Sequence, residues 1–187
     1  RVNEYLAAVA EVCADPDLQD IAEAMKDLLC EASDEGGRVF VLGMGGSAAN
    51  ASHVVNDLRN IARIRAYSPT DNVAEFSARV NDDGLASSFV RWLRQEGLCA
   101  RDAVLVLSVG GGTDEASPNI AEAVEYAWEC GACILCIVND AEGYVVTRAF
   151  PAITRRLPDP TRTPTTETMQ IAIMHAVCCA LRDEATP

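Results

Sequence analysis

The chain has 187 residues and a net charge of −13, with 49% of its residues hydrophobic and 23% charged. This composition is typical of a folded globular protein, and the length suits one domain with a sizeable core. The acidic balance excludes the usual basis for binding nucleic acid or anionic membranes, because both need clustered lysine and arginine. A phosphate ligand would therefore have to be held locally, by backbone amides, hydroxyl groups or a helix end.

Predicted helices and strands alternate along most of the chain. Apolar residues recur every three to four positions over 2–13 and 18–32, which predicts two leading amphipathic helices. Short apolar runs predict strands over 38–42, 103–108, 132–138 and 149–153, and helices are expected over 47–64, 71–79, 84–96, 117–130 and 165–182. Such alternation favours an α/β three-layer sandwich around a mostly parallel sheet. We expect one domain, 1–187, with a helical segment 1–36 and an α/β core 37–187.

The hydropathy and cysteine content point to a cytoplasmic protein. No apolar stretch approaches the roughly 18 residues of a membrane helix, and the first helix is acidic rather than signal-like, so we expect no membrane partner. The eight cysteines are interpreted as buried small residues, since disulfides are rare in the cytoplasm. Cys133 and Cys136 are three apart in a predicted strand and should lie on opposite faces, which disfavours a shared metal.

Two glycine-rich turns follow predicted strands. The first, Gly43-Met44-Gly45-Gly46-Ser47, opens a helix; the second follows Ser108 as Gly110-Gly111-Gly112 and precedes Ser117, a candidate N-cap. Neither has the spacing of a dinucleotide or triphosphate loop. Glycines at such turns expose amides to an anion, and the carboxyl ends of strands are where open α/β sheets bind ligands. A tight chain reversal without a ligand is the alternative interpretation.

Both histidines of the chain lie on predicted helices that also carry a carboxylate. His53 and Asp57 are four apart on one helix, so they share a face. Glu167 and His175 are eight apart on the last helix and project from roughly one face. Two His–carboxylate pairs suit proton transfer near neutral pH or a divalent metal, although each pair alone could equally be structural.

The run from Gly43 to His53 resembles the signature of phosphoheptose isomerases in the sugar isomerase (SIS) domain family. The resemblance extends to the leading helices, to Asn81-Asp82 before a Phe-containing helix, to the Ser108 loop, and to Glu167 and His175. It implies a flavodoxin-like SIS fold whose leading helices serve oligomerisation. It also implies a homotetramer with active sites between subunits and conversion of sedoheptulose 7-phosphate to a heptose 7-phosphate through an enediol.

The resemblance also implies a role for each matching residue. Asp57 would move a proton between C1 and C2, with His175 as its acid–base partner. A divalent metal, expected to be zinc, would be bound by four residues: His53, Asp57, Glu167 and His175. The residues expected to hold the phosphate or the sugar are Gly45, Gly46, Ser47, Asn81, Asp82, Ser108, Gly110, Gly111, Ser117 and Glu167.

Several positions depart from the family pattern. Met44 replaces the usual Asn, Asp57 replaces Glu, and Glu167 replaces Gln, while the second loop loses two hydroxyl groups. The loop glycines could offer amides instead. Three hypotheses follow: an isomerase of sedoheptulose 7-phosphate, a non-catalytic sugar-phosphate sensor, and an isomerase of another sugar phosphate. No DNA-binding segment accompanies the domain, which disfavours a regulator.

Overall fold

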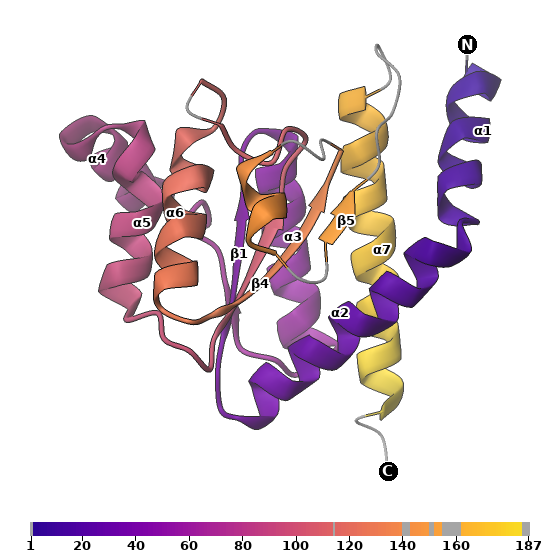
Figure 1. The fold of residues 1–187 in the computed structure, drawn as a ribbon, viewed down its shortest axis with the longest axis horizontal. Helices are drawn as coiled ribbons and strands as arrows, with labels where there is room; N and C mark the ends of the chain where they lie inside the picture. The colour runs from indigo at the N-terminus through magenta and orange to yellow at the C-terminus, as the bar shows by residue number, and fades with distance from the viewer. Residues whose placement is uncertain (1, 114, 140–142, 150–151, 155–161, 185–187) are drawn as a thin grey trace.

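A computed structural model describes residues 2–113, 115–139, 143–149, 152–154 and 162–184. Figure 1 shows the chain as helices packed around a central sheet. The helices are α1 (Val2–Cys13), α2 (Pro16–Asp34), α3 (Gly46–Asn60), α4 (Val73–Asp83), α5 (Leu85–Glu96), α6 (Pro118–Glu129), the 3-10 helix η1 (Tyr144–Thr147) and α7 (Arg162–Glu184). The strands are β1 (Val39–Gly43), β2 (Ala66–Tyr67), β3 (Ala103–Leu107), β4 (Cys133–Val138) and β5 (Ala152–Thr154).

The strands form one five-stranded sheet in the order β2-β1-β3-β4-β5, and every pairing is parallel. The predicted parallel sheet is therefore confirmed. Every residue of β1 and β3 is buried. A strand that is covered on both faces needs apolar side chains at every position, not at every second one. The continuous apolar runs of β1 and β3 are therefore typical of central strands in a parallel sheet.

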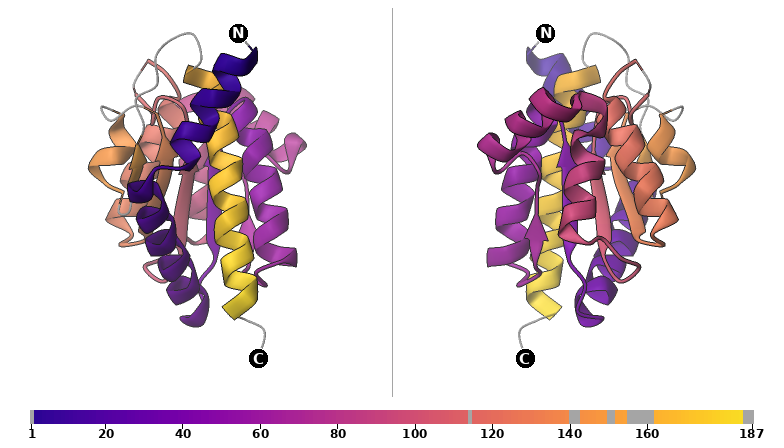
Figure 2. Two further views of the ribbon diagram at one scale, coloured as in Figure 1. Left: turned by 90° about the vertical axis from the view of Figure 1, so that its right-hand side faces the viewer. Right: turned by 90° about the vertical axis from the view of Figure 1, so that its left-hand side faces the viewer.

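Two cores lie on opposite faces of the sheet. Val39 and Val41 belong to the core beneath α2, α3 and α7, whereas Phe40 and Leu42 belong to the core beneath α5 and α6. Figure 2 shows α7 between α2 and α3 on one side and the α5–α6 layer on the other. This confirms the three-layer sandwich. It also places the thiols of β4 as predicted, because Cys133 packs on the first core and Cys136 in the second.

The boundaries differ from prediction mainly where the sequence carries little pattern. The two-residue strand β2 and the 3-10 helix η1 were not predicted. Helix α4 begins at Val73 rather than at 71, with the Asn72 side chain capping it, and runs on to Asp83. The long helix predicted over 47–64 ends at Asn60. No helix in the described part of the chain is both long and apolar enough to cross a membrane.

Candidate active site

Two glycine loops lie at the carboxyl ends of neighbouring strands. β1 leads into the first glycine turn and β3 into the second. Their registers pair Gly43 with Leu107, so the two loops start side by side on one edge of the sheet. The carboxyl edge of an open parallel sheet is where ligands bind in α/β folds.

The first glycine turn begins α3 without a side-chain cap. Gly45 occupies the N-cap position at φ 62°, in the left-handed region that favours glycine. Because glycine has no side chain, no side-chain hydrogen bond caps this end of the helix. No acidic residue lies in the first turn of α3. Ser47 is buried there, with 2% of its surface exposed. The start of α3 thus relies on groups from elsewhere to satisfy its amides and its positive dipole end.

The second loop is held in shape by hydrogen bonds to its own serine and to η1. The Gly111 amide donates to Ser108 Oγ at 3.0 Å. The amides of Tyr144 and Val145 donate to the carbonyls of Gly112 and Gly111, both at 3.0 Å. These bonds turn the two carbonyls toward η1. Ser108 Oγ accepts this bond and still has a hydroxyl hydrogen to donate.

Two residues at the start of α6 differ from what the sequence indicates. Ser117 stands at the N-cap position, as predicted, but at φ 58° and without a side-chain bond to the helix. Its predicted capping role is therefore wrong, and its hydroxyl is not committed to the α6 cap. Asn119 is fully buried, and both polar atoms of its amide lack a hydrogen-bond partner among the described residues. Nothing in the sequence pattern marks Asn119.

His53, Asp57 and His175 form one cluster between α3 and α7. The Nε2 atoms of the two histidines are 3.0 Å apart. Each Nε2 also lies 3.3 Å from Oδ2 of Asp57. The histidine side chains are 52% and 50% exposed and Asp57 is 9% exposed, so a nearly buried carboxylate faces two accessible imidazoles. The predicted His53–Asp57 pairing is confirmed.

This cluster fits a divalent metal. Its three ligand atoms all lie within 4.8 Å of one another. Donors about 2 Å from a tetrahedral ion are roughly 3.3 Å apart, close to the separations between Oδ2 and each Nε2. Three protein ligands leave a coordination position for a water or a substrate oxygen, which is the arrangement of catalytic rather than structural zinc sites.

The buried thiol of Cys178 lies beside this cluster. Burial chiefly raises the pKa of Cys178 to about 12, and the nearby carboxylate of Asp57 adds to this effect. Cys178 therefore remains a neutral thiol at neutral pH and acts as a small apolar residue, as predicted. The prediction that the cysteines are buried is wrong for Cys13 and Cys179, which are exposed.

Glu167 lies away from the cluster, against the first glycine turn. A Cβ atom on Gly46 would stand 2.5 Å from Oε2 of Glu167, so the carboxylate packs directly on Gly46. Eight residues separate Glu167 from His175, a rise of about 12 Å along α7. The structure therefore pairs His175 with Asp57, and the expected Glu167–His175 pair is not formed. Binding of a metal by all four predicted residues would require Glu167 to leave Gly46.

Asn50, which the sequence analysis did not single out, ties Glu167 in place. Its Nδ2 donates to the Glu167 carbonyl at 2.8 Å and to Gln170 Oε1 at 3.0 Å. Gln170 is fully buried and donates to the Ile137 carbonyl of β4 at 3.4 Å. The sequence shows only that Asn50 is a polar residue one turn into α3. It does not indicate that the hydrogen-bond partner of Asn50 lies 117 positions away.

Asn81 and Asp82 lie at the end of α4. Both are exposed, and Asn81 Nδ2 donates to Asp82 Oδ1 at 2.9 Å. The described contacts connect neither of them with the cluster or with the two loops. Their predicted contact with the sugar remains a prediction.

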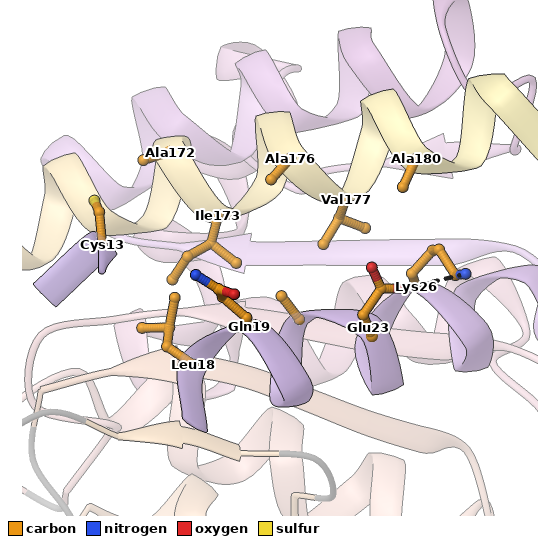
Figure 3. A pocket seen from close by; sticks show the side chains of 11 residues that line it. Cys13, Leu18, Gln19, Glu23, Lys26, Ala172, Ile173, Ala176, Val177 and Ala180 are labelled. Atoms are coloured by element: carbon orange, nitrogen blue, oxygen red, sulfur yellow. Dashed lines mark ion pairs between the residues drawn. The ribbon is translucent and has the colours of Figure 1, made fainter. Parts of the chain in front are cut away.

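A hollow of about 510 Å³ lies between α2 and α7, apart from the two loops. Figure 3 shows Ala172, Ala176 and Ala180 along α7 facing Leu18 and Glu23 on α2. Its walls are helix faces rather than strand ends or glycine turns. The hollow therefore differs in kind from a site for a phosphorylated ligand.

The fold and these loops define the class: a parallel α/β sheet covered by helices on both faces, with two glycine loops at the carboxyl ends of neighbouring strands. The SIS domain model matches residues 3–139. The chain therefore belongs to the SIS domain family.

Individual relatives agree with this family. The chain is 30% identical over 153 residues to a phosphoheptose isomerase of Rhodospirillum rubrum, covering 79% of this chain and 77% of that protein. The phosphoheptose isomerase GmhA of Neisseria gonorrhoeae has the same fold, with a TM-score of 0.82, 24% identity and 97% of each chain covered. The sugar isomerase domain of an RpiR transcription factor from Sphaerobacter thermophilus aligns with a TM-score of 0.65 and 17% identity, over 98% of this chain and 88% of that one. The chain is thus a phosphoheptose isomerase-like SIS protein, of the isomerase class of enzymes.

Proposed function

We propose that the protein interconverts an aldose and a ketose that carry a phosphate, with sedoheptulose 7-phosphate as the ketose. The observation that carries the proposal is the cluster of His53, Asp57 and His175, in which one nearly buried carboxylate faces two accessible imidazoles. Carboxylates and imidazoles are the side chains that transfer protons in such isomerisations. The phosphoheptose isomerase of Rhodospirillum rubrum supports the choice of substrate.

The proton transfers are assigned to Asp57 and His175. The Asp57 carboxylate takes a proton from C1 of the ketose, and the C1–H electron pair forms the C1–C2 double bond of an enediolate. His175 gives a proton from Nδ1 to the C2 oxygen and accepts the C1 hydroxyl proton there, because its Nε2 faces Asp57 and would bind the metal. Return of the first proton from Asp57 to C2 then leaves an aldehyde at C1. The Asn56 amide donates to Asp57 Oδ1 at 3.2 Å, which helps to orient the carboxylate.

A divalent metal, with zinc as our proposal, would be bound by His53, Asp57 and His175. When bound, such an ion polarises the substrate carbonyl and stabilises negative charge on the enediolate oxygens. His53 then serves chiefly to bind the ion. The phosphate and the sugar hydroxyls are assigned to the two glycine loops, through Ser47, Ser108, Ser117 and the amides of Gly45, Gly46, Gly110 and Gly111. Asn81 and Asp82 are retained as sugar contacts.

Assembly into a homotetramer, with active sites between subunits, belongs to the same proposal. Val2 and Leu6 on α1 are 74% and 57% exposed, an apolar surface that a second subunit could cover. The half-exposed histidines leave room for a neighbouring chain to complete the site. Sedimentation that shows only the 20.0 kDa monomer would contradict this part of the proposal.

A non-catalytic sugar-phosphate sensor is the second candidate. The observation in its favour is the fold shared with the RpiR transcription factor domain. A sensor needs only binding that differs between two states, so it should bind the sugar phosphate equally well without Asp57 or His175 as proton-transfer groups.

The test is to mix the purified protein with sedoheptulose 7-phosphate and to follow aldose formation, with and without added zinc. The proposal expects conversion that saturates with substrate. Binding without conversion in either condition would support the sensor hypothesis instead. Conversion of another ketose phosphate only would support an isomerase with a different substrate.

A further inference from the structure

The second glycine loop does not fix its own shape. Gly111 and Gly112 have φ values of 72° and 76°, in the left-handed region that favours glycine. Glycine adopts many other backbone conformations as readily, so the residues of the loop do not by themselves select this one. The conformation of the loop must therefore depend on contacts with another element.

Gly143, immediately before η1, lies directly against this loop. A Cβ atom on Gly143 would overlap the Gly110 carbonyl oxygen and would stand 2.7 Å from the Cα atom of Gly111. Gly143 itself has φ −62° and ψ 147°, a conformation that any residue can adopt. Glycine is thus required at this position by the contact with the loop and not by its own backbone conformation.

η1 holds the loop by its backbone. The amides of Tyr144 and Val145 donate to the carbonyls of Gly112 and Gly111, both at 3.0 Å. The Val145 side chain is fully buried in the core beneath α5 and α6. The loop is therefore bonded to a segment that is itself anchored in the core.

A cluster of side chains also fastens η1 to α6. The Tyr144 hydroxyl donates to Glu125 Oε2, and Arg148 Nε donates to the same oxygen at 3.3 Å. The Arg148 guanidinium lies 4.8 Å from the ring centre of Trp128 and 5.5 Å from that of Tyr144. The bond from Tyr144 is the chief cause that lowers the pKa of Glu125, and hydrogen bonds to an ionised carboxylate are the stronger kind. Because α6 follows the second loop along the chain, η1 is bonded both to the loop and to the helix that comes after it.

We propose that Gly143 and Tyr144 are positioning residues for substrate binding. Through η1 they hold the second glycine loop in the conformation that binds the substrate. The described contacts connect neither of them with His53, Asp57 or His175, so their substitution should weaken binding and spare proton transfer. This inference rests on the proposed function for the role of the loop in binding. The hold of η1 on the loop rests on the contacts alone, so it can be tested without turnover.

The experiment compares the wild type with Gly143→Ala and Tyr144→Phe, and Tyr126→Phe is the control. Tyr126→Phe removes the same hydroxyl group from α6, but that hydroxyl is hydrogen-bonded to Cys130 and the ring lies 5.0 Å from the Arg94 guanidinium of α5. Hydrogen–deuterium exchange of peptides from the second loop and η1 measures the hold on the loop. kcat and KM for sedoheptulose 7-phosphate and the affinity for zinc are measured on the same samples, and thermal melting confirms that each variant is folded.

We expect the second loop to exchange faster in Gly143→Ala and Tyr144→Phe than in the control. KM should rise roughly tenfold in Gly143→Ala, within the hundredfold loss that a displacement of about 1 Å can cause. In Tyr144→Phe it should rise roughly threefold, the effect of one lost hydrogen bond. kcat and zinc affinity should stay near the wild-type values, because the loop holds a part of the substrate that does not react.

Substitution of Glu125 tests the same contact from the other side. Glu125→Ala removes the acceptor of both Tyr144 and Arg148, so KM should rise at least as much as in Tyr144→Phe. Glu125→Gln keeps an oxygen that can accept the Tyr144 hydroxyl, so it should restore KM toward the wild-type value. Equal values of KM in Glu125→Ala and Glu125→Gln would contradict a role for this hydrogen bond.

Exchange of the loop that stays at the control rate in both Gly143→Ala and Tyr144→Phe would overturn the inference, even if the wild type isomerises its substrate normally. Faster exchange with an unchanged KM would overturn it as well, and so would a higher KM without faster exchange, because the two residues would then not act through the loop. Faster exchange in a protein that never isomerises a sugar phosphate would uphold the hold of η1 on the loop and refute the proposed function. The two failures are therefore distinguishable.

Discussion

Asp102 and Asp57 are both nearly buried carboxylates beside basic side chains, yet their surroundings differ completely. Asp102, before β3, accepts bonds from the Arg38 amide at 2.9 Å, from Arg38 Nε at 3.2 Å and NH2 at 2.8 Å, and from the Cys99 amide at 3.1 Å. Arg38 in turn donates to the carbonyls of Glu96 and Gly97. Asp57 faces two half-exposed imidazoles and a single amide group.

The difference separates a structural carboxylate from a reactive one. Burial alone would raise the pKa of Asp102, but bonds from the Arg38 side chain and from the backbone amides of Cys99 and Arg38 lower it below its usual value. Asp102 is thus held as an anion with its hydrogen-bonding capacity largely used, at the amino edge of the sheet. Asp57 has fewer donors and an open side, where a metal or a substrate can complete its contacts.

The largest effect is expected for Asp57→Asn. An amide cannot take the C1 proton, so kcat should fall by roughly a thousandfold, within the range usual for loss of a general base. Sugar-phosphate binding, measured by calorimetry, should persist. Asp34→Asn, an exposed change at the end of α2, is the control and should leave kcat unchanged. Full turnover in Asp57→Asn would remove Asp57 from the catalytic role.

Asp102→Ala should reverse this pattern, with loss of stability and retention of kcat. Removing the carboxylate leaves a partly buried guanidinium and two backbone amides without their acceptor, at a cost of about 3 kcal/mol in the free energy of unfolding. Urea denaturation measures the loss, and turnover of the folded fraction measures kcat. A variant as stable as the wild type would show that the Arg38–Asp102 pair does not differ from an exposed ion pair.

The next largest effect is expected for His53→Ala, which removes a proposed metal ligand. Removing one of three ligands should weaken zinc binding roughly a hundredfold, at the upper end of the 10- to 100-fold usually lost with an outer-shell partner. Calorimetric titration of the metal-free protein with zinc measures the affinity. Arg59→Ala, an exposed change on the same helix, provides the control. Equal zinc affinity in His53→Ala would place the metal elsewhere.

The comparison also shows which parts of the molecule could be predicted from sequence. The central strands were predictable because β1, β3 and β4 are continuous apolar runs, and His53–Asp57 because a spacing of four defines a helix face. β2 was not predicted, because two residues are too few to show a hydrophobic periodicity. The pairing of His175 with Asp57 and of Glu167 with Gly46 depends on the packing of α7 on α3, which residue spacing within one helix does not specify.

The smallest expected effect is the acid sensitivity that Asp102 adds to stability. Its pKa is lowered in the folded protein, so the unfolded chain binds the proton more readily. The contribution is therefore fully present above the unfolded value of about 3.9 and is lost as the pH falls through the lower folded value. Urea denaturation of wild type and Asp102→Asn from pH 7 downward measures it. The difference between the two should be constant near neutral pH and shrink in acid, whereas a difference that grew in acid would mean that Asp102 is held in its protonated form.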